Sequence, residues 1–67
     1  MIVIGVNPEK RYYVYNLFKV VYGSRALLDS GMSNDLSRWE VCVPEELGRH
    51  MILLLATVGV SFGYRAG

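Results

Sequence analysis

The chain opens on an unbroken apolar stretch and then changes to helical spacing. Ile2–Val6 is a run of β-branched residues interrupted by a single glycine, which predicts a strand buried at the centre of a sheet. Pro8–Tyr22 follows, and the preceding asparagine with the Pro-Glu pair forms a typical helix start. The apolar residues of one helical face are Val14, Leu17, Phe18 and Val21. We therefore expect a helix that stops at Gly23.

The same segment has a second interpretation, as the return strand of a β-hairpin. The sequence Asn-Pro-Glu-Lys also suits a type I turn, and the tyrosines and valines that follow favour strands. Strict alternation, however, would place Lys19 on one face and Asn16 on the other, so neither face would be cleanly apolar. A helix is the better prediction, and the N-terminal hairpin remains the alternative.

The middle of the chain is expected to contain two strands. Ser24–Asp29 can form a short strand, and Ser30–Asp35 is dense in turn-forming residues, which predicts a loop. Ser37–Val43 then alternates apolar and polar residues, the clearest strand pattern in the sequence. Its apolar face carries Trp39, Val41 and Val43, and its polar face carries Arg38, Glu40 and Cys42.

A second helix and a final strand complete the pattern. Pro44 and two glutamates repeat the helix start, and apolar residues follow at helical spacing: Leu47, Met51, Leu54, Leu55 and Val58. Gly59 ends this helix, and Val60–Arg65 alternates as a strand. Met51–Tyr64 carries no charge, but its 14 residues are too few for a membrane helix, which needs about 20.

The order β-α-β-β-α-β predicts a single small α+β domain over residues 1–67, the ferredoxin-like plait. Two helices would cover one face of a four-stranded antiparallel sheet, and right-handed crossovers give the strand order 4-1-3-2. This arrangement resembles ACT-type regulatory modules, which bind small effectors at dimer interfaces; the resemblance is one of architecture alone. RNA-recognition motifs also share it but display stacking aromatics on the open face, where Trp39 is not expected.

Size and composition predict self-association. A chain of 67 residues removes only about 60% of its unfolded surface from water, so its own core is marginal. Hydrophobic residues make up 52% of the chain and charged residues only 19%. After His50 the second helix is apolar on nearly every side, since Ile52, Leu53 and Ala56 lie away from its main stripe. We therefore expect a homo-oligomer, a dimer being the commonest form.

Charge and cysteine content limit the binding partners, the metal and disulfide sites and the cellular location that the sequence allows. The net charge of +1 excludes a strong general attraction to nucleic acid or to an anionic membrane. Cys42 is the only cysteine, which excludes an internal disulfide and a zinc site built from several thiolates. The segment Met1–Val6 lacks the features of a signal peptide. We expect no metal, no cofactor and a cytoplasmic location.

The open sheet face is the first candidate binding surface. Strand alternation places Arg38, Glu40 and Arg65 there, and Arg25 joins them if the second strand has the matching phase. The first strand turns either Val3 and Gly5 or their neighbours toward this face. In the first case the centre of the face consists of the small residues Gly5, Ser61 and Gly63, which allow another surface to approach closely. The alternative is that the arginines are merely solvated or paired with Asp29 and Glu40.

The tyrosines of the first helix are the second candidate. Tyr12, Tyr13, Tyr15 and Tyr22 alternate with the basic residues Lys10, Arg11 and Lys19. Such a cluster can anchor a protein interface or stack on nucleobases, and Tyr12 and Tyr15 are the residues we select for binding. The alternative is that the tyrosines only fill the edge of the core.

Catalysis has little support in the sequence. No phosphate-binding loop, nucleophile elbow or metalloprotease motif is present, and His50 and Cys42 have no evident catalytic partners. We therefore expect a small non-enzymatic binding or regulatory module that acts through protein–protein contacts. The alternative is a nucleic-acid-binding module that uses the arginine-bordered face and the tyrosine cluster. Steep weakening with salt would identify the latter.

Overall fold

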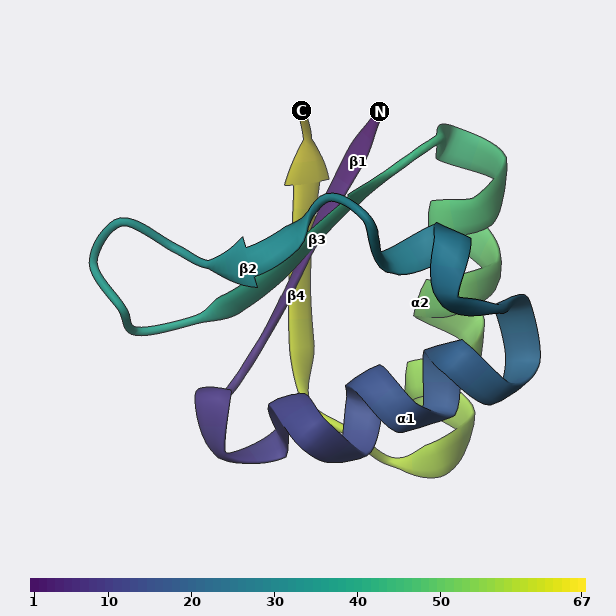
Figure 1. Cartoon of the computed structure of the whole chain (residues 1–67), viewed down its shortest axis with the longest axis horizontal. Coiled ribbons are helices and arrows are strands. Elements are labelled where there is room, and N and C mark those ends of the chain that lie inside the picture. The colour runs from purple at the N-terminus through teal and green to yellow at the C-terminus, as the bar shows by residue number, and fades with distance from the viewer.

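The computed structural model describes residues 1–67 and shows the predicted order of four strands and two α-helices (Figure 1). The elements are β1 (Ile2–Val6), α1 (Arg11–Tyr22), β2 (Ser30–Met32), β3 (Trp39–Val43), α2 (Glu45–Val58) and β4 (Phe62–Ala66). Two short 3-10 helices, Pro8–Lys10 and Ser24–Leu27, flank α1. The α+β plait is confirmed.

The four strands form one antiparallel sheet in the order β2-β3-β1-β4, which is the predicted order read from the other edge. β1 lies between β3 and β4, so that Ile4 is opposite Val41 on one side and Tyr64 on the other. β2 and β4 are the edge strands, and each has one side that pairs with no other strand.

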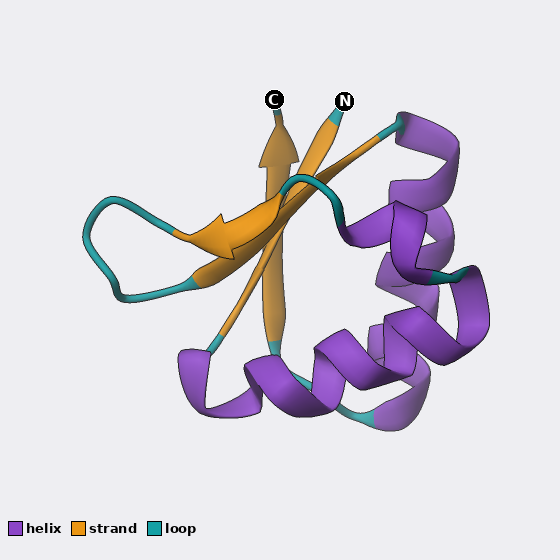
Figure 2. Ribbon diagram, viewed as in Figure 1, coloured by secondary structure: helices purple, strands orange, loops and turns teal.

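The core lies between the sheet and the two helices, which are on the same side of the sheet (Figure 2). Its buried residues are Ile4, Val6, Val14, Phe18, Leu27, Trp39, Val41, Val43, Met51 and Leu55. The residues of β1 and β3 in this set alternate along their strands, because one face of the sheet is covered and the other is open. Trp39 is on the covered face, as predicted.

The first helix forms where it was predicted, and the hairpin alternative is wrong. The side chain of Asn7 accepts a hydrogen bond from the amide of Glu9 at 2.9 Å, so it caps the turn that leads into α1. Val14 and Phe18 are fully buried, whereas Val21, expected on the same stripe, is half exposed at the end of the helix.

The second strand was predicted at the wrong place. Ser24–Leu27 is a 3-10 helix, and β2 lies within the segment predicted to be a loop. Leu27 supplies the physical reason, because the turn after Gly23 brings its side chain into the core. The next three residues, Ser30–Met32, pair with β3 as β2. The loop between the two strands is closed by the Ser33 amide, which donates a hydrogen bond to the Arg38 carbonyl at 2.8 Å.

The C-terminal half follows the prediction with one shift. Gly59 ends α2 in the left-handed conformation, with a φ of 78°, and the Val60 amide donates to the Leu55 carbonyl at 3.0 Å. This cap holds Val60 at the end of the helix, so β4 begins two residues later than predicted. No helix of the chain is both long enough and apolar enough to cross a membrane.

Asp35 organises the loop between β2 and β3, and this predicts a pH dependence. Its carboxylate accepts hydrogen bonds from the Ser33 hydroxyl at 2.5 Å and from the Ser37 amide at 3.0 Å. These bonds, that of Ser33 first, lower the pKa of Asp35 to about 2. The resulting stabilisation is present above the ordinary pKa of aspartate and is lost as the pH falls toward the lowered value.

We therefore expect the side-chain carbon shift of Asp35 to titrate with a midpoint of about 2 when followed by NMR. The variant Asp35→Asn should remove this part of the acid dependence while leaving the sheet intact. A midpoint equal to that of a free aspartate would contradict the hydrogen bonds in this loop.

Candidate functional site

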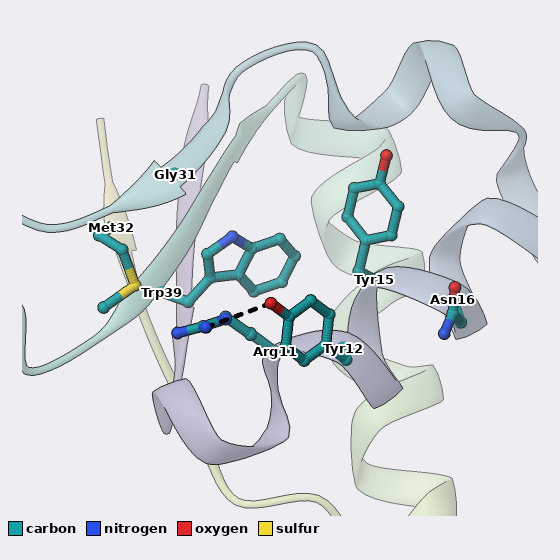
Figure 3. A pocket seen from close by; sticks show the side chains of 7 residues that line it. All are labelled: Arg11, Tyr12, Tyr15, Asn16, Gly31, Met32 and Trp39. Atoms are coloured by element: carbon teal, nitrogen blue, oxygen red, sulfur yellow. Dashed lines mark hydrogen bonds between the residues drawn. The ribbon is translucent and has the colours of Figure 1, made fainter.

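A hollow of about 440 Å³ lies between the start of α1 and the β2–β3 hairpin (Figure 3). The hairpin extends away from both helices in Figure 1, and side chains of α1 and of both hairpin strands enclose the hollow. The lining residues are Arg11, Tyr12, Tyr15 and Asn16 from α1, Gly31 and Met32 from β2, and Trp39 from β3. We call this hollow the α1–β2 groove.

Trp39 forms the floor of the groove and is only 6% exposed. Its ring meets that of Tyr15 edge to face, with centroids 6.3 Å apart, a favourable arrangement for two aromatic rings. Its indole N–H, on the side of the ring toward β2 in Figure 3, makes no hydrogen bond to another residue and is not sealed from solvent. The floor is therefore apolar and contains one free donor.

Arg11 and Tyr12 form the end of the groove nearest the start of α1. Arg11 Nη2 donates a hydrogen bond to the Tyr12 hydroxyl at 3.3 Å, and its guanidinium carbon lies 4.8 Å from the centre of the tyrosine ring. The hydrogen bond, and then the positive charge, hold the pKa of Tyr12 below its ordinary value. Arg11 has no ion-pair partner, so its charge is available to a ligand in the groove.

The predicted tyrosine cluster is divided, because its members lie on different sides of α1. Tyr12 and Tyr15 line the groove. Tyr13 lies on the opposite flank, beside Val58 at the end of α2. Tyr22 packs against the core with its ring centroid 5.9 Å from that of Phe18, and burial raises the pKa of its hydroxyl. The core-edge interpretation is therefore right for Tyr22.

The open sheet face gathers part of the predicted arginine cluster. Arg38 lies across Gly5 and Gly63, which are opposite each other on β1 and β4, and its Nη2 donates to the Gly5 carbonyl at 3.3 Å. A Cβ atom at either glycine would collide with the guanidinium. Arg65 is paired with Glu40 at 2.7 Å, as the ion-pair alternative predicted.

Two residues expected on this face lie elsewhere. Arg25 belongs to the 3-10 helix after α1, beside Tyr22 and Leu47, because the second strand is not where it was predicted. Ser61 precedes β4 and lines a hollow at the end of α2, because the helix cap delays the strand. The open face therefore has one unpaired arginine instead of three.

The remaining reactive side chains do not come together. His50 is exposed on α2, on the helical side of the sheet, whereas Cys42 is a half-buried free thiol on the open face. The sheet separates them, so they cannot act as a nucleophile and its base. No group of three His, Cys, Asp or Glu side chains is placed to hold a metal ion.

The contribution of the hairpin to the groove was missed by the sequence analysis. Gly31 and Met32 stand in a segment rich in turn formers, and Trp39 was given a role only in the core. No local sequence signal could have identified the groove, because it depends on the pairing of Met32 with Trp39, which places both side chains on the covered face.

No protein-family model, curated protein or solved structure matches the chain.

Proposed function

We propose that this chain is a protein-binding module that holds an apolar side chain of a partner protein in the α1–β2 groove. The observation that carries the proposal is the 440 Å³ hollow, whose floor is a buried tryptophan and whose walls include two tyrosines and a methionine. Its volume is within the range of about 300 to 1,000 Å³ that ligand sites occupy. Trp, Tyr and Arg are also the residues most enriched among those that dominate binding energy at protein interfaces.

The packing of the groove supports a binding role because little has to be ordered on binding. Trp39 is fixed by the core beneath it and by the edge of the Tyr15 ring. Binding in the groove therefore costs the entropy of the ligand but little additional entropy from ordering Trp39. The groove is open along one side, which suits a projecting side chain of a larger molecule.

The nucleic-acid alternative has less support. Arg25 lies away from the open face, and Arg65 is already paired with Glu40, which leaves Arg38 as the unpaired cation there. Nucleic acid would need several phosphate contacts, and its binding would weaken steeply with salt.

The groove is tested with N-acetyl-phenylalaninamide as a minimal probe, followed by NMR. We expect the probe to shift the indole N–H signal of Trp39 and the ring signals of Tyr15, with little dependence on salt. Tyr15→Ala should weaken this binding by about tenfold, because the probe would cover the partly exposed Tyr15 ring and an aromatic hot-spot residue contributes about 1.4 kcal/mol or more. Tyr64→Ala is the control, because Tyr64 is exposed on β4 outside the groove. Shifts confined to other surfaces, or none, would contradict the proposal.

We further propose that a second copy of the chain covers the outer side of the two helices. Leu53 points away from the core and is 67% exposed, and Val20 and Val21 of α1 are exposed as well. Lys19 lies in the last turn of α1, and Glu46 lies in the first turn of α2 beside Glu45, which is paired with Arg49. A two-fold arrangement that places the end of α1 against the start of α2 of the other copy would bring Lys19 and Glu46 together.

Sedimentation equilibrium tests this part of the proposal. We expect a dimer at micromolar concentration and a monomer for Leu53→Glu, because a charge in the centre of an apolar interface is left without water or a partner. Leu36→Glu is the matched control, since Leu36 is 68% exposed but lies in the hairpin loop. A wild-type monomer, or equal effects of the two substitutions, would contradict it.

We also propose a reducing, cytoplasmic location, because Cys42 is a free thiol.

A further inference from the structure

The outer edge of β2 offers main-chain groups that no other strand uses. The Ser33 amide donates to the Arg38 carbonyl at 2.8 Å, so these two residues form a hydrogen-bonded pair of the β2–β3 ladder. Bonded and non-bonded pairs alternate along an antiparallel ladder. Gly31 is therefore in the next bonded pair, whereas Ser30 and Met32 turn their N–H and C=O groups outward.

This unpaired edge runs alongside the α1–β2 groove. The side chain of Met32 and the backbone of Gly31 line the groove, so a strand added to the edge of β2 would lie directly over it. Every second side chain of such a strand would point toward Tyr12 and Tyr15. The free indole N–H of Trp39 and the unpaired charge of Arg11 are within the same hollow. An acidic side chain is therefore favoured beside the apolar one.

We propose that the partner enters the groove as an extended segment that pairs with β2 as an additional strand. Its main chain bonds to Ser30 and Met32, an aromatic or branched apolar side chain fills the hollow over Trp39, and a carboxylate two residues away approaches Arg11. This inference rests on the proposed function of the groove. It adds the conformation and chemistry of the partner segment.

The first experiment tests main-chain pairing with the blocked pentapeptide acetyl-Glu-Val-Tyr-Val-Glu-amide, whose tyrosine and glutamates share one face when it is extended. We expect it to bind at least about tenfold more tightly than N-acetyl-phenylalaninamide, read from Trp39 emission and NMR shifts. Two N-methylated versions are compared, one methylated at both valines and one at the tyrosine. Because alternate amides face opposite edges of a strand, we expect one version to lose binding and the other to retain it.

The second experiment compares two substitutions at one residue of the edge. Met32→Pro removes the outward N–H, and proline is tolerated at such a position because the ladder with β3 does not use that group. Met32→Ala removes the same side chain but keeps the N–H. We expect Met32→Pro to weaken pentapeptide binding at least about tenfold more than Met32→Ala, with circular dichroism showing that both fold.

The outcomes separate the two proposals. If N-acetyl-phenylalaninamide binds at Trp39 but neither N-methylation changes pentapeptide binding, the added strand is overturned and the groove stands. If neither probe binds, both proposals are overturned. If Met32→Pro instead abolishes dimer formation, the strand that pairs with β2 comes from a second copy, and the inference of a separate partner segment is wrong.

Discussion

Phe18→Ala is expected to leave most of the chain unfolded at room temperature. Phe18 is fully buried in the centre of the core and packs against Tyr22. Truncating a buried phenylalanine costs about 3 to 5 kcal/mol through lost burial and the cavity left behind. A single core in a chain of this length rarely supplies more than about 3 to 5 kcal/mol of stability, so the loss is comparable to the whole.

Urea denaturation followed by circular dichroism checks this expectation. Tyr12→Ala is the matched control on the same helix, because Tyr12 is an aromatic residue that is 69% exposed, and its truncation should cost less than about 1 kcal/mol, the exposed contact with Arg11 included. If the two variants were equally stable, α1 would not be packed through Phe18, and the amphipathic assignment of this helix would be wrong.

Periodicity predicted those elements that have one buried face. In β3 the alternation of Trp39, Val41 and Val43 is set by burial of every second side chain, and the same three residues are in the core. β2 could not be predicted in this way. Its residues Ser-Gly-Met have no local strand preference. They form a strand because they hydrogen-bond to β3, and a pattern of neighbouring residues does not reveal such pairing.

The candidate sites were predicted only as far as strand and helix phase determine them. Phase placed Arg38, Glu40 and Arg65 on one face, and the structure has them there. Arg25 was misplaced because the burial of Leu27 makes Ser24–Leu27 a 3-10 helix and not a strand. Ser61 was misplaced because the cap of α2 at Gly59 delays the start of β4. The groove could not be predicted, because it depends on the pairing of Met32 with Trp39, and the position of β2 was predicted wrongly.

The groove and the outer helical surface do not share exposed residues, so the two proposed contacts are compatible. The groove uses the start of α1 and the hairpin, whereas Val20 lies near the end of α1 and Leu53 lies on α2. A dimer formed through the helices would therefore present two grooves. Such an assembly could bind a partner with two matching segments more tightly than a single chain could.

Gly48→Ala is expected to destabilise the chain, although alanine is favoured over glycine inside a helix by about 1 kcal/mol. Gly48 is buried in the first half of α2, where the helix crosses Ile2 of β1. A Cβ atom at this position would lie 2.9 Å from the Cβ atom of Ile2 and 3.1 Å from its Cδ1 atom. The nearer atom is attached to the main chain and cannot rotate away, so the helix must move off the sheet.

That movement would loosen Met51 and Leu55, which lie on the same face of α2 and are fully buried. Overpacking of this kind typically costs about 1 to 3 kcal/mol, more than the gain in helix propensity, so we expect a net loss of stability in urea denaturation. Ala56→Gly is the opposite control on an exposed position of the same helix, where the loss of alanine should cost about 1 kcal/mol. Glycine is thus expected to be the better residue at position 48 and the worse one at position 56. If Gly48→Ala were the more stable protein, α2 would lie farther from β1 than the structure places it, and the contact that brings Met51 and Leu55 onto the sheet would have to be reassigned.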